Sequence, residues 1–334
     1  MLVAAAGFCV PTLSVAGGVA GAIDSLATLS GFRADLSSQE IRGVLAKANL
    51  AYVGHRPGGW AAADAVLWKL RERTGTKPVA DLIAASLLSK KLAMGVLHGV
   101  VDVRVGPAGN AGSDFRTSLE TAYEVIGVAG FLGMRVGCVL SDARELGWPS
   151  IGRIDAILSM LDVLASPAKY SSHEHIQLCV AVAAAACEAA QPSVPFDTWR
   201  QQVERGLSDL TAEKMFKSAC IAQGASKDAF DRLRELAMSR TTIAVDLPPG
   251  ALLDVSKLSE AIKLIRSRMP KEDHAFLGVN AAEPRSISVL LPPSSSHLVD
   301  TARDALSSAV RREPAHATMP PLLAKWDWQL QPIN

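Results

Sequence analysis

The sequence predicts an α/β protein with a mostly parallel central sheet and flanking helices, a remnant of a small helical domain, and a small carboxyl-terminal α+β domain. Short apolar runs alternate with amphipathic segments up to residue 240, which is the pattern of βαβ units. The chain has 334 residues, of which 49% are hydrophobic and 20% charged, so it can bury a sizeable core. After residue 240 the pattern changes to short strands separated by helices.

The first half of the chain supplies alternating strands and helices of the predicted α/β domain. Ser37 and Glu40 have the spacing of a capping box and open one of these helices. A turn around Gly75 separates two others. The strands are expected over 10–15, 51–53, 96–105 and 134–140, and the helices over 22–29, 37–48, 60–73, 79–93 and 115–132.

The second half is mainly helical before it changes character. Helices are expected over 151–165, 172–190, 196–206 and 226–239, then strands over 242–247, 275–279 and 286–291 with helices over 256–268 and 298–310. The predicted domains are an α/β domain over 1–59 and 94–240, a helical-domain remnant over 60–93, an α+β domain over 241–312, and a polar tail over 313–334.

Charge and cysteine content narrow the possible function classes. The net charge is +1 with no basic cluster, so we expect neither nucleic-acid nor membrane-surface binding. Residues 1–23 lack a basic start, and glycines interrupt them, so we expect no signal peptide or membrane span. Five cysteines without a CxxC pair suggest reduced thiols and a cytoplasmic location. Four lie in apolar sequence and are predicted core residues: Cys9, Cys138, Cys179 and Cys187.

The segment Ser86-Leu87-Leu88-Ser89-Lys90-Lys91 is the best candidate for a functional site. Ser86 and Lys90 are four residues apart, so they project from one face of a helix. Arg71 comes from the preceding helix. Two cations and a hydroxyl of this kind can hold a planar base and stabilise negative charge that develops on it.

These residues, taken with their neighbours, resemble the thymidine phosphorylase and pyrimidine-nucleoside phosphorylase family of pentosyltransferases. The similarity runs from about Val3 to about Leu161, roughly half the chain. It is carried by Ser86 to Ala93 and by five further segments, Asp102 to Gly106, Leu67 to Thr76, Ala63-Asp64, Val53-Gly54 and Ser30-Gly31-Phe32.

The resemblance implies reversible phosphorolysis of a pyrimidine nucleoside to a free base and a pentose 1-phosphate. Phosphate would be the co-substrate, and no other cofactor is expected. The resemblance assigns Arg71, Ser86 and Lys90 to base binding, and Arg71 and Lys90 to catalysis through stabilisation of the departing base.

The phosphate half of the family pattern is poorly represented. The family's K-x-S-T-G-G phosphate loop has no counterpart, and Ala22 stands where the family has a phosphate-contacting threonine. Ser14 is the one remaining phosphate contact suggested by the resemblance. A dianion needs several donors and positive charge, so we expect weak phosphate affinity for this chain alone.

Two alternatives therefore remain open beside the phosphorylase. One is a divergent pentosyltransferase with a different acceptor, and the other is a non-catalytic binding or partner subunit. The resemblance also implies a homodimer, or a second chain that supplies helices missing here. Without such a partner, we expect apolar side chains of the helical remnant to be uncovered, namely Val66, Leu67, Leu70, Leu82 and Ile83.

Two further histidine sites are candidates for ligand contacts. His173 and His175 alternate on a predicted helix and diverge, so we expect no metal site there. His55 stands where the family has glutamine and is expected to be a loop histidine, with a place in the lining of the cleft as the alternative.

Overall fold

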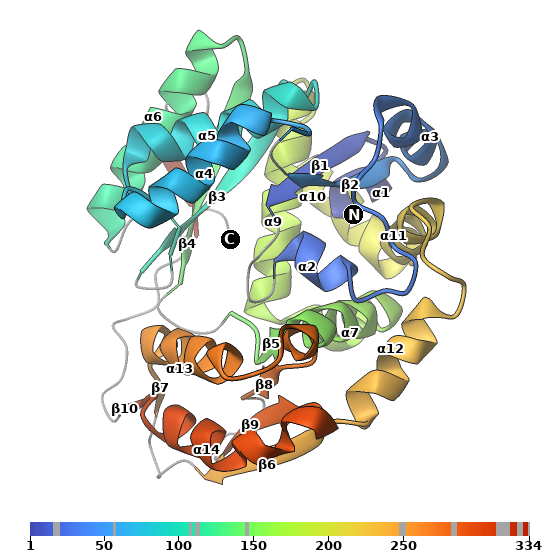
Figure 1. Ribbon diagram of the computed structural model, residues 1–334. Coiled ribbons are helices and arrows are strands. Elements are labelled where there is room, and N and C mark those ends of the chain that lie inside the picture. The colour runs from blue at the N-terminus through green and yellow to red at the C-terminus, as the bar shows by residue number, and fades with distance from the viewer. Residues whose placement is uncertain are drawn as a thin grey trace.

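The computed structural model describes residues 1–15, 21–55, 58–106, 109–110, 114–143, 147–246, 252–281, 286–311, 321–325 and 330–332. The fold is mixed α/β, as the sequence predicts, with helices packed around several sheets (Figure 1). The sequence has two glycine-rich segments, around Gly17 and between Gly106 and Gly112. The described residues include them only in part, since 16–20, 107–108 and 111–113 lie outside the described ranges.

Two parallel strand pairs form the framework of the α/β part. Strand β1 (Val10–Val15) pairs with β2 (Leu50–His55), and β3 (His98–Val105) pairs with β4 (Arg135–Asp142). Within the described residues these pairs belong to separate sheets, where the sequence suggested one central sheet. Helix α5 (Ala80–Ala93) contacts both β1 and helix α6 (Phe115–Phe131), so it connects the two sheets.

Local signals place the helices of the first half close to their predicted limits. Ser37 and Glu40 form the expected capping box at the start of α3 (Ser38–Ala48). Asn49 ends that helix in the left-handed conformation, which asparagine tolerates better than most residues. Helices α2 (Ala22–Leu26) and α4 (Ala62–Thr74) are also predicted from the sequence, whereas the short helix α1 (Leu2–Ala5) has no counterpart in the sequence prediction.

A helical layer fills the middle of the chain and supplies much of the core. It comprises α7 (Arg153–Ala165), α8 (Pro167–Tyr170), α9 (Glu174–Ala190), α10 (Phe196–Ser208), α11 (Thr211–Ala222) and α12 (Ala229–Met238). Helix α11 has no counterpart in the sequence prediction, although it buries Phe216 and Cys220. The Gln223 side chain after it bonds the backbone N–H and C=O of Tyr52, which satisfies the outer edge of β2.

The carboxyl-terminal part has its own antiparallel sheet and its own core. Figure 1 shows most of its helices and strands in orange and red below α7. The sheet order is β5-β8-β9-β6, and the core is built around Leu258, Ile265, Ile287 and Leu291. Its elements are β5 (Ser150–Gly152), β6 (Thr241–Asp246), β7 (Leu252–Leu253), α13 (Val255–Ser267), η1 (Lys271–Ala275), β8 (Gly278–Asn280), β9 (Ser286–Leu291), η2 (Pro293–Leu298), α14 (Val299–Ser307) and β10 (Val310–Arg311).

A buried ion pair links this part to the α/β part. Both terminal nitrogens of Arg240 donate to the Asp155 carboxylate at 2.8 Å, and the two side chains are 4% and 11% exposed. Gly152 has φ +150°, and a Cβ there would overlap the Asp155 carboxylate. A glycine is therefore required for the close approach of β5 to this pair.

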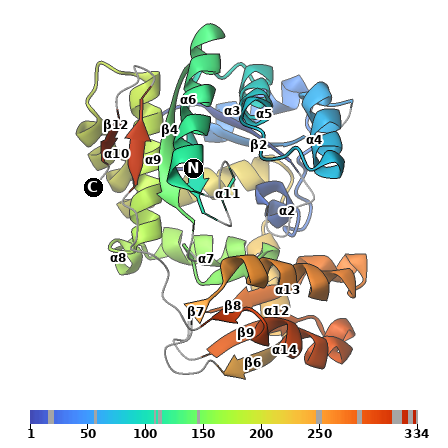
Figure 2. The same cartoon turned by 90° about the vertical axis from the view of Figure 1, so that its left-hand side faces the viewer.

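The carboxyl-terminal segment contributes two strands, where the sequence suggested only a polar tail. Strand β11 (Leu322–Ala324) pairs antiparallel with β4, and β12 (Leu330–Pro332) pairs with β11. Figure 2 shows these strands beside α9 and α10. The Lys325 amine contacts the Glu188 carboxylate of α9 at 3.0 Å, which fixes the segment to the helical layer.

Two sequence predictions about exposure can be compared with the structure. Cys138 and Cys187 are buried and Cys179 is half-buried, but Cys9 is exposed, so its prediction as a core residue is wrong. Cys9 follows the short helix α1 at the surface, where its apolar neighbours cannot cover it. Throughout the described ranges, no helix combines the length and the apolar character needed to cross a bilayer.

Candidate functional site

The candidate site lies between helices α4 and α5, which carry the residues singled out from the sequence. Arg71 is in the last turn of α4, and Ser86 and Lys90 are one turn apart on α5. The Lys90 amine donates to the Ser86 hydroxyl at 2.7 Å, so the predicted shared helix face is confirmed. All three side chains lie against the protein interior; Arg71 and Ser86 are each 8% exposed.

Asp64 in the first turn of α4 lies at the centre of this cluster. Its Oδ2 accepts from the Lys90 amine at 2.9 Å, and both side chains are largely buried. The sequence contained Asp64 within the Ala63-Asp64 match but did not assign it a role. A buried ammonium needs a nearby anion, and this requirement is the signal that could have identified Asp64.

His55 at the end of β2 approaches the same oxygen from the other side. Its Nε2 is 3.0 Å from Asp64 Oδ2, and the imidazole is 2% exposed. The two groups are not aligned as a hydrogen bond, so within the described part Nε2 is a buried atom with no hydrogen-bond partner. The expectation that His55 is a loop histidine is wrong, because the parallel pairing of β2 with β1 extends through this residue.

Electrostatics in the cluster follow from burial and from the Asp64 carboxylate. Burial lowers the pKa of Lys90, while Asp64 raises it and Arg71 lowers it further. Burial also lowers the pKa of His55, against the opposing effect of Asp64, so the imidazole is neutral at pH 7. The cluster thus places two basic groups, the Arg71 guanidinium and the Lys90 amine, against one carboxylate, which gives it an excess of positive charge.

Arg71 has a structural task that the sequence did not reveal. Its Nη1 donates to the Leu82 carbonyl at 2.9 Å, and its Nη2 donates to the Lys77 carbonyl. These bonds tie the end of α4 to the turn and the start of α5. A guanidinium has five N–H donors, so Arg71 can still offer N–H groups from Nη1 and Nη2 to a ligand.

Ser14 lies close to this cluster in the sheet but on a different face. It pairs with Gly54 on β2, and the next pair along is Val15 with His55. Since side chains alternate across a strand, Ser14 and His55 point to opposite faces of the β1–β2 pair. The structure therefore does not bring Ser14 together with His55.

A second cationic cluster lies near the end of β1. Arg153 at the start of α7 contacts the Asp24 carboxylate of α2 at 3.2 Å, and both side chains are largely buried. Arg266 of α13 is close enough for Arg153 and Asp24 to affect its pKa, which burial lowers. This cluster joins the α/β part to the carboxyl-terminal part.

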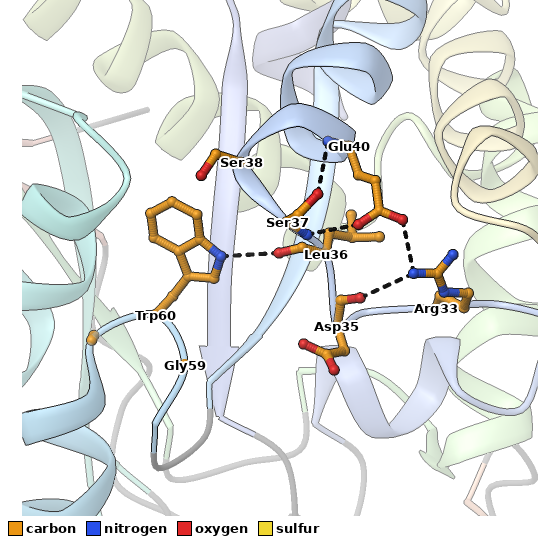
Figure 3. A pocket seen from close by; sticks show the side chains of 9 residues that line it. Arg33, Asp35, Leu36, Ser37, Ser38, Glu40, Gly59 and Trp60 are labelled. Carbon is orange, nitrogen blue, oxygen red and sulfur yellow. Dashed lines mark hydrogen bonds and ion pairs between the residues drawn. The ribbon is translucent and has the colours of Figure 1, made fainter.

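The described residues also line a pocket of about 690 Å³ in front of α3, shown in Figure 3. Trp60 borders it and donates its indole N–H to the Leu36 carbonyl at 3.1 Å. Arg33 pairs with Glu40 at 2.8 Å, and Glu40 also accepts from the Ser37 backbone. These polar groups bond one another, so the pocket offers few free donors. It adjoins Ala61, three residues before Asp64.

Histidines near α9 form a different cluster. His173 caps α9 by accepting from the His175 backbone, and the His175 ring lies 3.8 Å from the Cys179 sulfur. Burial and Asp102 raise the pKa of Cys179 to about 11, so its thiol is not an activated nucleophile. Among the residues that the structure describes, no group of three or more metal-binding side chains is placed to hold an ion.

The outer face of α4 exposes large apolar side chains, as expected from the sequence. Val66, Leu67 and Leu70 are 57%, 52% and 51% exposed, and Leu82 on α5 is 37% exposed. Ile83 differs: it is 6% exposed, because α5 packs against α6 and buries it in a core cluster.

Comparison with known proteins places these observations in a family context. No family model matches the chain. It is 27% identical over 231 residues to the pyrimidine-nucleoside phosphorylase of Geobacillus stearothermophilus, covering 69% of this chain and 52% of that enzyme. It is 27% identical over 271 residues to the enzyme of the same name from Bacillus subtilis, covering 79% of this chain and 60% of that enzyme. It is 34% identical over 166 residues to the thymidine phosphorylase of Mycobacterium tuberculosis, covering 49% of this chain and 38% of that enzyme.

The matched region thus spans about half the length of these curated relatives. Enzymes with both names match the chain, and the resemblance predicted from the sequence motifs is confirmed. The chain is a distant homologue of the pyrimidine-nucleoside and thymidine phosphorylases.

Proposed function

We propose that this protein is a nucleoside phosphorylase-like pentosyltransferase that acts on a pyrimidine nucleoside and phosphate. The observation that carries the proposal is the excess positive charge around Asp64. Arg71 and Lys90 supply two cations against one carboxylate, in a largely buried setting. An anionic ligand would balance that charge.

In this reaction the departing base carries the negative charge. A phosphate oxygen attacks C1′ of the pentose, the C1′–N bond breaks, and its electron pair leaves with the pyrimidine. Lys90 and Arg71 would donate to the ring oxygens, with the Ser86 hydroxyl as a further donor. Hydrogen bonds to a charged group contribute roughly 1.5–3 kcal/mol each, and these strengthen as the charge develops.

The Lys90 ammonium keeps a donor for this task. Two of its three N–H groups are directed to Asp64 and Ser86, which leaves one for a ligand. Asp64 and Ser86 fix the amine in place, and fixed donors need no reorganisation during the reaction. Base binding by Arg71, Ser86 and Lys90 is part of the proposal.

Phosphate would be the co-substrate, with no other cofactor. Ser14 at the end of β1 is its proposed contact, although the Ser14 and His55 side chains point to opposite faces of the β1–β2 pair. One hydroxyl is a small donor set for a dianion. We therefore include in the proposal a second copy of the chain, or another chain with further phosphate donors, joined at the apolar face of α4 and α5. We place the reaction in the cytoplasm.

A second candidate is a base-binding partner subunit without activity, or a transferase with another acceptor. The observation that favours it is the engagement of Arg71 with two backbone carbonyls, which gives this arginine a role independent of any substrate. The burial of Ser86 and the presence of only one proposed phosphate donor, the Ser14 hydroxyl, also favour this second candidate.

The test is phosphate-dependent release of uracil or thymine from uridine or thymidine. Purified wild type is compared with Lys90→Ala and with Lys263→Ala, an exposed lysine on α13. If the protein is a phosphorylase, base release should require phosphate, be lost in Lys90→Ala and be unchanged in Lys263→Ala. A folded chain that binds uracil without releasing it from uridine supports the partner subunit. Release with another acceptor, but not with phosphate, supports the divergent transferase.

A further inference from the structure

We propose that His55 is a positioning residue that controls the placement of the Lys90 ammonium through Asp64. This inference rests on the proposed function for its catalytic meaning, but the coupling among the three side chains can be measured without any turnover.

Two nitrogens converge on one carboxylate oxygen. Lys90 Nζ lies 2.9 Å and His55 Nε2 lies 3.0 Å from Asp64 Oδ2. The His55 and Asp64 side chains are 2% and 7% exposed, so water cannot replace either contact easily. Within the described part, the buried His55 Nε2 has no hydrogen-bond partner although it lies this close to the carboxylate oxygen.

The three residues come from three elements, so their meeting depends on tertiary packing. His55 ends β2, Asp64 starts α4 and Lys90 ends α5. The groups that face the imidazole are the Asp64 carboxylate, the Lys90 ammonium and the backbone of Ala61, which hydrogen-bonds the ring. Arg71 acts on the same carboxylate from the end of α4.

The charge state of His55 decides how Asp64 is shared. While the imidazole is neutral, the carboxylate is available to hold Lys90 against Ser86. A protonated imidazole adds a second cation at the same oxygen, which competes with Lys90 and repels it. Lys90 is then held less firmly, and its alignment with a departing base is lost. The site should therefore work above the pKa of His55 and weaken below it.

The coupling is tested by following the His55 ring by NMR as a function of pH in the folded protein. His55→Gln assigns the resonance. Removal of the neighbouring cation in Lys90→Gln should raise the pKa of His55 by roughly one unit, and Asp64→Asn should lower it. Lys91→Gln is the matched control: the Lys91 amine interacts with Lys90 and Cys138 but is not among the groups that act on His55, so the pKa of His55 should be unchanged. A His55 titration that is the same in Lys90→Gln and wild type overturns the proposal.

The catalytic consequence is tested by the pH profile of kcat/KM for nucleoside phosphorolysis. In wild type the rate should fall on the acid side, and in His55→Gln this fall should shift to lower pH. His98→Gln, at an exposed position on β3, is the control. A merely structural histidine would change stability without moving the acid limb, and an unmoved limb overturns the positioning role. If a folded wild type shows the NMR coupling but no phosphorolysis, the proposed function fails and the His55–Asp64–Lys90 coupling is supported.

Discussion

Asp64→Asn is the most informative single change, because within the described residues Asp64 is the carboxylate that compensates the buried Lys90. The substitution keeps the size of the side chain and removes its charge. The Lys90 side chain, which is 12% exposed, then has only the Ser86 hydroxyl and a neutral amide beside its ammonium. Breaking a buried ion pair by removing one partner typically costs about 3–5 kcal/mol.

The ordinary pKa of lysine sets an upper limit to this cost in unfolding free energy. Lys90 can escape its unfavourable state by losing its proton. From an ordinary lysine pKa near 10.5, deprotonation at pH 7 costs about 1.36 kcal/mol per unit, or about 4.8 kcal/mol over about 3.5 units. We therefore expect Asp64→Asn to lower the free energy of unfolding by about 3 to 5 kcal/mol at pH 7.

The sign of the pH dependence provides a second check. In the variant, the pKa of Lys90 is lower in the folded than in the unfolded chain, so the unfolded chain binds more protons between the two values. Stability of the variant therefore rises with pH in that window, and the difference from wild type shrinks between pH 7 and about pH 10. Burial already lowers the pKa of Lys90 in wild type, but Asp64 opposes this, so the wild-type slope is smaller.

The assay is urea unfolding of wild type and Asp64→Asn at pH 7 and pH 10, with Asp304→Asn as the control. Asp304 is exposed on α14, so its loss should change stability by no more than about 0.5 kcal/mol. A loss below about 1 kcal/mol for Asp64→Asn at pH 7, or a loss that does not shrink at pH 10, would refute the assignment of Asp64 as the compensating anion.

Three further predictions concern the joint, the core and the thiols. Arg240→Ala leaves the Asp155 carboxylate buried and should cost about 3–5 kcal/mol in urea unfolding, whereas Arg234→Ala breaks an exposed pair and should cost less than about 1 kcal/mol. Leu88→Ala should cost about 2–5 kcal/mol, since this side chain is fully buried; a comparable loss for the half-exposed Leu67→Ala would contradict the packing described for α4. An aromatic disulfide reagent added to the native protein should modify the exposed Cys9 first, and the buried thiols should react only on unfolding. Fast modification of a Cys9→Ser variant would count against this.

The sequence determined the parts of the site that depend on local geometry. Ser86 and Lys90 are four residues apart on a helix, so their contact follows from helical periodicity alone. The Ser37–Glu40 capping box likewise follows from a three-residue spacing. The family resemblance came from motifs of this local kind, and the curated relatives confirm it.

Tertiary structure alone decided which groups surround Lys90. His55 and Asp64 are separated from it by 35 and 26 positions in the chain, and only the packing of β2, α4 and α5 brings them to one oxygen. Packing also turned Arg71 toward two carbonyls and added the strands β11 and β12 to the edge of β4. Apart from the Arg71 bonds, which span 6 and 11 positions, these contacts join residues distant in sequence. No periodic pattern encodes them, because each depends on the free energy of burying many side chains at once.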